Sequence, residues 1–464
     1  MNKLISEFGS FRDPAGKVFY SNGKVYRELS ETGIERYQFI KNKNLIKDLI
    51  DKEYLINTNE CEKDKLDFKI DEKKIYLEHE KIDFISYPYE WSFTQLKDAA
   101  IFHLDFQIYL IEKGIKLIDA SAFNIQFKNN KPIFIDVLSL CEYKDGEYWY
   151  AHKQFCENFL NPLILSSKKG IDFNNWFRGN LEGIHTRDLA PLLNFKDLFS
   201  PTVFFHVYLL NKLDEKSKKE PKKTDEKLKK AKSLSKKNYL NLLTQLKNYI
   251  TNLKNKKRIT NWDGYSDKNT YDETEEKIKL EIIKNFVDEN KPNFLADLGC
   301  NEGKFSEYAS KVNNIKVIGI DFDLNVLDKA FLKAKKENKN FFPIYADFSN
   351  PSNNLGWNGL ERKSLVERSK FDGVIALALI HHLVIAKNIP LSQVLNWLTT
   401  FAPKGLIEFV PKDDPTIKIM LKLKGDIFPE YNESNFREKL STFAKIKKIS
   451  EVTKSKRKIY EFSK

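Results

Sequence analysis

Short apolar segments alternate with amphipathic ones along residues 274 to 410, and this alternation restricts the fold more than any other feature of the chain. Apolar stretches with the length of buried strands occur at 294–298, 316–320, 342–346, 373–377 and 405–410. Segments with helical spacing of apolar residues occur at 274–289, 304–312 and 325–337. Such alternation predicts an α/β domain with a mostly parallel sheet, helices on both faces, and ligand sites at the carboxyl ends of the strands.

The first of these strands ends in an acid and opens into a glycine-containing turn. Residues 294–303 read FLADLGCNEG, with Asp297 in the strand and Gly299 and Gly303 four positions apart. The dinucleotide fingerprint instead needs glycines at its first, third and sixth positions. Asn301 tolerates a positive φ, so a ligand can approach the backbone of this turn closely. With no pyrophosphate to neutralise, Asp297 favours a cationic ligand.

Acids also stand at the ends of the next two strands. Asp321 follows the strand at 316–320, where a carboxylate can accept both hydroxyls of a ribose. Asp347 follows the strand at 342–346 and can accept from an adenine amino group, while Phe348 offers an apolar wall. Each acid alone is more often a cap or turn residue. Their order and spacing together indicate one shared ligand site.

This set of residues resembles the donor site of the class I S-adenosylmethionine-dependent methyltransferases. The resemblance implies a Rossmann-like fold and S-adenosyl-L-methionine as the cofactor. It implies that the methionine end is held by Asp297, Gly299 and Gly303, the ribose by Asp321, and the adenine by Asp347 and Phe348. Asn301 stands where many members have glycine, but the turn chemistry is preserved.

Methyl transfer to a hydroxyl or a protonated amine needs a base, and two histidines follow the strand at 373–377. His381 and His382 are the candidate catalytic residues because imidazole titrates near neutral pH, with His382 slightly favoured. Packing without proton transfer is the alternative for each. Glu408 and Lys412, near the end of the last strand, are candidates for binding a polar acceptor such as a sugar, with charge pairing as the alternative.

A polar segment with three aromatic residues precedes the first strand of the domain. Trp262, Tyr265 and Tyr271 lie where many of these enzymes carry a lid over the donor, and their rings could stack on a sugar or on adenine. Ordinary packing of this lead-in segment explains them equally well.

The N-terminal half carries a second arrangement of polar residues. An amphipathic helix around 101–111 precedes Asp119 and Asn124, and a hairpin then ends in Asp136. This order resembles the catalytic and metal loops of the protein kinase and aminoglycoside phosphotransferase superfamily, where the first Asp orients a hydroxyl and the other two residues hold magnesium. Leu117 and Ile118 replace the usual His and Arg, and no Val-Ala-Ile-Lys strand is evident upstream.

These departures predict a degenerate kinase-like α+β domain that binds a substrate rather than phosphorylates it. The first alternative is an N-terminal module that binds nucleotide or transfers phosphate. The second is that the same residues have only structural roles in turns and helix caps. The expected organisation is a kinase-like domain at 1–211, a Lys-rich linker with a connecting helix at 212–260, and the methyltransferase domain at 261–464.

The positive charge of the chain is concentrated in two segments. Of the net charge of +13, residues 212–258 carry +12 and residues 436–464 carry +7, so the remainder is net acidic. A solvated linker and helix surface account for the first segment better than a nucleic-acid interface does. A nucleic-acid partner is therefore not expected, and an RNA methyltransferase that uses these lysines is the alternative function.

Several aromatic and polar segments across both halves together resemble a two-domain bacterial group related to nodulation-type methyltransferases. They are 87–93 (YPYEWSF), 119–124, 262–271, 355–357 (LGW) and 380–383 (IHHL). The resemblance implies O- or N-methylation of a small-molecule or glycan acceptor, such as a surface polysaccharide or glycolipid. It leaves the methylated atom and the oligomeric state open.

The four cysteines and the hydropathy pattern bear on location and metals. Cys61, Cys141, Cys156 and Cys300 are not paired at the short spacings of zinc sites, so no metal is expected. No apolar run approaches the length of a membrane span, and the first residues do not resemble a signal peptide. These features favour a cytoplasmic protein.

Overall fold

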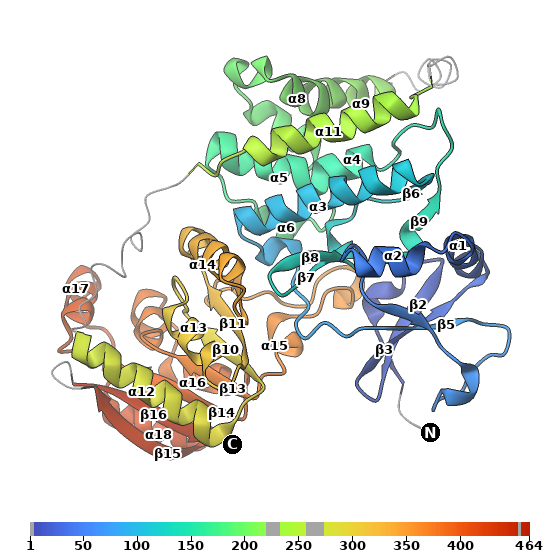
Figure 1. The fold of residues 1–464 in the computed structure, drawn as a ribbon. Coiled ribbons are helices and arrows are strands. Elements are labelled where there is room, and N and C mark those ends of the chain that lie inside the picture. Colours follow the sequence, from blue (N-terminus) through green and yellow to red (C-terminus); the bar gives the residue numbers. More distant parts are fainter. Residues whose placement is uncertain (1–3, 220–232, 257–272, 453–455) are drawn as a thin grey trace. The chain divides into compact units, whose positions relative to one another are not determined.

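The computed structural model describes residues 4–219, 233–256, 273–452 and 456–464. The chain forms two compact units (Figure 1). The first unit comprises Met1–Lys257 together with the short segment Asn354–Arg362. The second comprises Arg258–Asn353 and Lys363–Lys464.

A seven-stranded sheet forms the centre of the second unit. Its order is β12-β11-β10-β13-β14-β16-β15. The first five of these strands are parallel, and β16 runs antiparallel to both of its neighbours. The strands are β10 (Phe294–Leu298), β11 (Lys316–Asp321), β12 (Phe341–Tyr345), β13 (Gly373–Ala376), β14 (Lys404–Phe409), β15 (Lys445–Val452) and β16 (Arg457–Ser463). The mostly parallel sheet expected from the apolar runs is confirmed.

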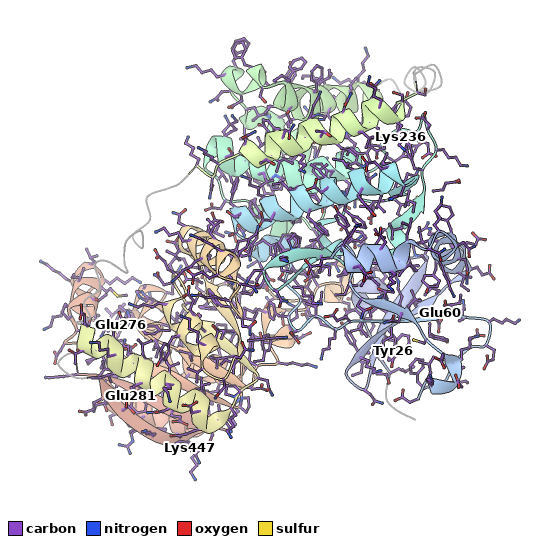
Figure 2. The ribbon with its side chains drawn as sticks, viewed as in Figure 1. Tyr26, Glu60, Lys236, Glu276, Glu281 and Lys447 are labelled. Carbon is purple, nitrogen blue, oxygen red and sulfur yellow. The ribbon has the colours of Figure 1, made fainter. Side chains whose placement is uncertain are left out.

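Helices cover both faces of this sheet. They are α12 (Glu273–Asn290), α13 (Lys304–Lys311), α14 (Leu324–Lys336), α15 (Leu365–Arg368), α16 (Leu391–Leu398), α17 (Pro415–Lys424) and α18 (Glu433–Phe443). On one face, Ile283 and Phe286 of α12 join Leu295, Ile375 and Leu406 in the buried core. On the other face, the ring of Phe436 from α18 contacts Phe409 of β14 and Tyr460 of β16. The outer surfaces are charged, as Glu281 on α12 and Lys447 on β15 illustrate (Figure 2).

The basic C-terminal segment belongs to the fold of the second unit. Residues 436–464 form most of α18 and the two strands β15 and β16, which complete the sheet edge. Lys445, Lys447 and Lys448 of β15 are exposed, which is how an edge strand avoids pairing with another sheet. The high lysine content of this segment therefore coexists with regular strand pairing.

The first unit begins with an antiparallel sheet and continues as a mainly helical region, an α+β arrangement. The sheet has the order β1-β2-β3-β5-β4. Its strands are β1 (Ile5–Ser6), β2 (Gly16–Ser21), β3 (Lys24–Leu29), β4 (Thr58–Glu60) and β5 (Tyr76–His79), and the helices α1 (Glu31–Asn42) and α2 (Leu45–Asp51) lie between β3 and β4 in sequence. Phe19, Tyr26, Phe68 and Tyr76 pack their rings together on this sheet.

A long helix and two small hairpin-like sheets follow. The helix α3 (Phe93–Glu112) begins at a capping box in which Ser92 and Gln95 satisfy each other's backbone amides. After it come the strand pairs β6 (Ile115–Leu117) with β9 (Leu140–Glu142), and β7 (Ile125–Lys128) with β8 (Lys131–Phe134). The helix and the hairpin expected around Asp119 and Asp136 are thus present.

The helices that complete the first unit include the one at 236–252, which was expected to lie in a linker between the two halves. They are α4 (His152–Phe155), α5 (Asn161–Ile164), α6 (Asn174–Gly179), α7 (Thr186–Leu189), α8 (Pro201–Val203), α9 (Leu210–Lys219) and α11 (Lys236–Asn252). The helix α11 packs along α3 within the unit, and the Tyr239 hydroxyl accepts a hydrogen bond of 3.0 Å from Gln107. Part of the Lys-rich segment, up to Lys219, is helical rather than extended linker. No helix among the described residues is long and apolar enough to cross a membrane.

Candidate functional site

The turn after β10 has the left-handed backbone that its residues were expected to adopt. The φ angles of Gly299, Asn301 and Gly303 are +81°, +49° and +82°. A side chain at Gly303 would place its Cβ 2.5 Å from the ring of Phe341, so glycine is required there by space as well as by backbone angle. Gly303 also caps the first turn of α13. The turn is therefore compact and packs closely against the ring of Phe341.

Asp321, at the end of β11, holds this turn in place. One of its carboxylate oxygens accepts a 2.8 Å hydrogen bond from the backbone amide of Asn301, and the other accepts from the amide of Asp323. Burial raises the pKa of Asp321 to about 6, against the opposing effect of these two amides. A carboxylate has roughly four lone-pair sites, so Asp321 keeps acceptor capacity for a ligand.

Asp297 lies at the penultimate position of β10 and is 3% exposed. It accepts a hydrogen bond from the hydroxyl of Ser306, on the first turn of α13. Burial raises the pKa of Asp297 to about 7, and the nearby charge of Asp321 adds to the shift while Ser306 opposes it. Two buried carboxyls at the tips of neighbouring parallel strands thus repel each other, and neither forms an ion pair with a Lys, Arg or His among the described residues.

Further polar atoms at these strand ends lack partners. The Oδ2 atom of Asp323 and the Nδ1 atom of His381 are buried and have no hydrogen-bond partner among the described residues. Buried polar atoms in native proteins are nearly always satisfied by protein, water or ligand. The second unit therefore offers unused hydrogen-bonding capacity at this edge of its sheet.

Asp347 and Phe348 follow β12, as expected. Asp347 accepts hydrogen bonds from both the amide and the hydroxyl of Ser349, at 2.8 and 2.6 Å, which form a local turn on one of its oxygens. Phe348 is buried, with its ring centroid 5.3 Å from that of Trp397. Phe322, directly after Asp321, is 51% exposed and is a second aromatic side chain at this edge that the sequence analysis did not single out.

His381 and His382 follow β13 through a strained residue, Ala378, whose φ is +50°. His381 is 2% exposed, and burial lowers its pKa well below the ordinary value. Burial lowers the pKa of the less buried His382 to about 4, helped by the charge of Arg457. Both imidazoles are therefore neutral at physiological pH, and both are weak bases in the ligand-free protein.

Glu408 has a different environment from the one expected for an acceptor-binding residue. It is fully buried and accepts two hydrogen bonds from Lys279, at 2.8 and 2.9 Å, and one from the amide of Ala378. Arg457 lies 3.6 Å away and pairs with Asp414. All oxygens of Glu408 are thus engaged by the core, and its contact with Ala378 supports the strained backbone before the two histidines.

The remaining acceptor candidates divide into one surface pair and a segment without a described structure. Lys412 forms an ion pair of 2.7 Å with Asp426 on the surface, which is the alternative considered for it. Trp262, Tyr265 and Tyr271 lie outside the described residues. Their part in a lid stays a prediction.

The polar residues of the N-terminal half also come together within the first unit. Asn124 donates to both oxygens of Asp119, at 3.1 and 3.2 Å. The Ser139 hydroxyl contacts Asp119 at 3.3 Å and Asp136 at 2.5 Å. Burial raises the pKa of Asp119 to about 7, and the charge of Asp136 adds to the effect.

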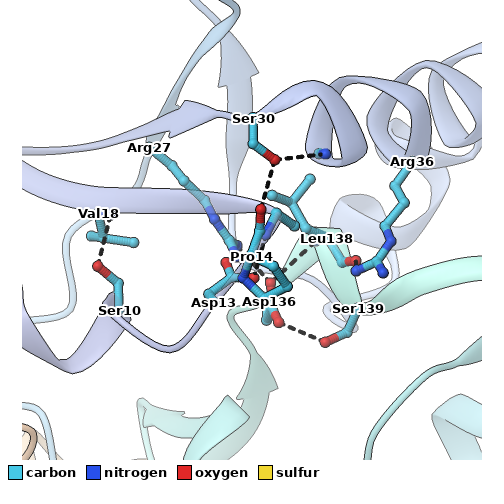
Figure 3. Close-up of polar contacts among 12 residues, drawn as sticks. Ser10, Asp13, Pro14, Val18, Arg27, Ser30, Arg36, Asp136, Leu138 and Ser139 are labelled. Carbon is cyan, nitrogen blue, oxygen red and sulfur yellow. Dashed lines mark hydrogen bonds and ion pairs between the residues drawn. The ribbon is translucent and has the colours of Figure 1, made fainter.

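Arg27 joins this cluster, and no sequence motif had pointed to it. Arg27 is 5% exposed, and its guanidinium lies between Asp13 and Asp136, with Nη1 2.5 Å from Asp136 (Figure 3). Burial disfavours the charged form of Asp136, but Arg27 and Ser139 outweigh it, and its pKa is lowered overall. The dipeptide Asn22-Gly23 was the available signal, because it forms the tight turn that joins β2 to β3 and so reveals the strand carrying Arg27.

Two solved structures are similar to part of this chain. Among solved structures, magnesium protoporphyrin IX methyltransferase (ChlM) from Synechocystis PCC 6803 with bound SAH is 19% identical, with a TM-score of 0.29 over 41% of this chain and 83% of that one. The bifunctional kinase-methyltransferase WbdD is 17% identical, with a TM-score of 0.31 over 43% of this chain and 42% of that one.

A relative covers nearly the whole length of both chains. No protein-family model matches the sequence. The nodulation protein NoeA of Rhizobium meliloti (strain 1021) is 41% identical over 457 residues, which is 98% of this chain and 95% of that protein. This identity shows that the chain belongs to the NoeA family of nodulation proteins.

Proposed function

We propose that the second unit is an S-adenosylmethionine-dependent methyltransferase and that its donor site lies at the carboxyl ends of β10, β11 and β12. The observation that carries this proposal is the pair of buried acids, Asp297 and Asp321, beside a left-handed turn whose amide is fixed by Asp321. Such a site suits a ligand that brings positive charge and hydroxyl donors. When bound, the donor supplies an electrophilic methyl group on a sulfonium.

The residues of the site divide the binding between them. Asp297, with the turn from Gly299 to Gly303, holds the methionine end, and the raised pKa of its carboxyl falls again when an ammonium group approaches. Asp321 accepts from the ribose hydroxyls with the lone pairs that Asn301 and Asp323 leave free. These roles follow the resemblance and are supported by the burial of both acids.

The adenine position rests on aromatic side chains and one carboxylate. Phe348 provides a buried wall and the exposed ring of Phe322 a second surface, while the Asp347 oxygen that does not serve Ser349 accepts from the exocyclic amine. Stacking on the two rings favours an aromatic base, and the hydrogen bond to Asp347 selects a base that carries an amino group. Phe322→Ala is therefore expected to weaken donor binding without altering the fold, because this ring is half exposed.

The histidines after β13 contribute mainly by contacting and orienting the acceptor. His382 is the one that meets the acceptor, since it is the less buried of the pair. It is neutral at physiological pH and can therefore take a proton from an acceptor hydroxyl or ammonium. Alignment of the acceptor and exclusion of water supply the larger part of the rate.

The acceptor we propose is a hydroxyl or amino group of a glycan or glycolipid. Membership of a nodulation family and the resemblance to methyltransferases associated with surface glycans support this class. The test supplies methyl-labelled donor and the full chain to cell extracts separated into glycan, RNA and protein fractions. We expect label in the glycan or glycolipid fraction, and label confined to RNA would overturn the acceptor assignment.

Two variants make this test specific. Asp297→Asn removes a charge from the donor site, so labelling should fall by at least about tenfold, the ratio that corresponds to 1.4 kcal/mol. Glu281→Gln is the matched control, because Glu281 is an exposed acid on the outer side of α12 and should leave labelling unchanged. Equal labelling by the wild type and Asp297→Asn would contradict the role given to Asp297.

We further propose that the first unit is a kinase-like module that recognises substrate and transfers no phosphate. Its residues do not fit magnesium, because the cationic guanidinium of Arg27 already neutralises Asp136 where a metal would bind, and Asn124 donates to both oxygens of Asp119. Asp119, with a pKa of about 7, remains able to accept from a substrate hydroxyl. Adding magnesium-ATP should leave the melting temperature unchanged, and a rise that Asp136→Asn abolishes would overturn this proposal.

A further inference from the structure

Three metal-ligating side chains lie together in the helical part of the first unit, outside the clusters described above. They are His152, Cys156 and His206. His152 begins α4 and Cys156 begins the π-helical turn η6 (Cys156–Leu160) that continues it, so the two side chains are four positions apart on one helical face. His206 belongs to another π-helical turn, η10 (Phe204–Leu209), which leads into α9. Turns of this kind are rare and occur often at functional sites.

The ligand atoms of these side chains converge on one point. The Nε2 atom of His152 lies 2.8 Å from Nδ1 of His206 and 3.5 Å from Sγ of Cys156. All three atoms lie within 4.8 Å of one another. Each side chain therefore directs its metal-binding atom toward the other two, although the residues are up to 54 positions apart in sequence.

We propose that His152, Cys156 and His206 bind a Zn²⁺ ion through Nε2, Sγ and Nδ1. Tetrahedral zinc has bonds of about 2.0 to 2.3 Å to nitrogen and sulfur, which separate two nitrogens by roughly 3.3 Å and a nitrogen from a sulfur by roughly 3.5 Å. The observed sulfur-to-nitrogen distance already has this value. The two imidazoles need to move apart by only about half an ångström.

The chemistry of the donor set selects this ion. One thiolate and two imidazoles suit zinc, whereas magnesium and calcium require oxygen ligands. Trp149 packs against the ring of His152, at 5.4 Å between centroids, and Cys156 is fully buried, so the site is shielded on its inner side. Three protein ligands leave the fourth position of the ion to water or another small ligand.

Binding has a defined proton balance. The Cys156 thiol must lose its proton to solvent before sulfur can coordinate. The imidazole that donates the hydrogen bond between His152 and His206 must carry its proton on its other ring nitrogen instead. One proton is therefore released for each zinc bound, and zinc crosslinks α4 and η6 to η10.

A hydrogen-bonded chain of the same three side chains is the alternative explanation. It would give the same distances between the imidazoles and the thiol without any affinity for a metal. The two explanations differ in the response of the protein to a metal with a visible spectrum, because only coordination produces thiolate-to-metal charge transfer.

The test uses the full chain after treatment with a chelator and a thiol reductant. Titration with Co²⁺ should produce a charge-transfer band and the visible bands of a tetrahedral ion, saturating at one equivalent, and Zn²⁺ should displace it. Zinc should also release one proton per chain and raise the melting temperature. Absence of the charge-transfer band from the folded wild type would overturn the proposal without recourse to any variant.

Variants assign the ligands. Cys156→Ser and His206→Gln should each abolish the charge-transfer band or weaken cobalt binding by at least about tenfold, the range that loss of a ligand implies. Cys141→Ser is the matched control, since Cys141 lies on β9 outside the cluster and should leave the band unchanged. A band that persists in Cys156→Ser and disappears in Cys141→Ser would contradict the assignment. Circular dichroism shows whether each variant is folded.

Discussion

At the scale of single residues, the buried carboxyl of Asp297 makes the stability of the ligand-free protein depend on pH. Its folded-state pKa of about 7 lies above the ordinary value of about 3.9 for aspartate, so the folded state binds its proton more tightly. The resulting stabilisation is fully present below pH 4 and is lost as the pH rises through about 7. It amounts to on the order of a few kcal/mol.

The measurement is calorimetric melting of the second unit between pH 5.5 and pH 8. We expect the wild type to lose stability from this group as the pH rises across that interval, with Asp321 contributing in the same direction through its pKa of about 6. Asp297→Asn should make the dependence shallower, because an amide does not titrate. If the stability of Asp297→Asn depended on pH as steeply as that of the wild type, the carboxyl of Asp297 would not titrate between pH 5.5 and pH 8.

Gly303 is the second residue whose environment gives a sharp prediction. Gly303→Ala should destabilise the second unit by about 1 to 3 kcal/mol, because it combines a positive φ with a clash against Phe341. Gly425→Ala is the control: Gly425 also has a positive φ, of +78°, but nothing lies within 4 Å of its added Cβ. Urea unfolding measures both. Equal losses in the two variants would mean that the packing against Phe341 contributes nothing.

At the scale of elements, the ion pair between α12 and β14 determines how firmly the helix is held on the sheet. Lys279→Met should destabilise the second unit by about 3 to 5 kcal/mol, since it leaves Glu408 buried with only Arg457, 3.6 Å away, as a cation. Lys284→Met removes an exposed pair with Asp288 on the same helix and should change stability little. Denaturant unfolding of both variants tests the difference.

Removing both charges of the Lys279–Glu408 ion pair tests whether the unpaired charge causes the loss of stability. The double variant Lys279→Met with Glu408→Gln removes both charges and should recover part of the lost stability. Ala378 would then lose a carboxylate acceptor, so we expect methyl transfer to stay impaired even where stability returns. Full recovery of activity would show that Glu408 has no positioning role.

Some of these elements could be predicted from the sequence and others could not. The five parallel strands and the helices α12, α13 and α14 were predicted, the strands because buried strands need continuous apolar runs, as in Phe294–Leu298. β15 was not, because its solvent face carries three lysines that hide the pattern. The three positive φ angles of the donor turn followed from glycine and asparagine, whereas the burial of Glu408 depends on Lys279, 129 positions away, and no local pattern reveals it.

At the scale of the whole molecule, a nine-residue segment of the C-terminal half belongs to the first unit. Within that unit Glu361 pairs with Arg12, and the guanidinium of Arg362 lies 4.1 Å from the centroid of the Phe123 ring. The chain thus leaves the second unit at Asn354 and returns at Lys363. The chain therefore passes from one unit to the other three times, after residues 257, 353 and 362, and unfolding of the first unit must release this segment.

Arg362→Ala tests this sharing. It should destabilise the first unit by about 1 to 2 kcal/mol through loss of the buried cation-to-ring contact. Arg437→Ala, an exposed arginine on α18, is the control and should leave unfolding unchanged. Differential scanning calorimetry of the full chain separates the transitions. A loss confined to the second unit would contradict membership of the segment in the first.

The most direct test of the account is calorimetric titration of the full chain with S-adenosylhomocysteine at neutral pH. We predict binding at one site per chain, weakened by about tenfold or more in Asp321→Asn, because a charged acceptor of hydrogen bonds contributes roughly 1.5 to 3 kcal/mol. Glu281→Gln should bind like the wild type. No heat of binding with folded wild-type protein would contradict the donor site at the ends of β10 and β11.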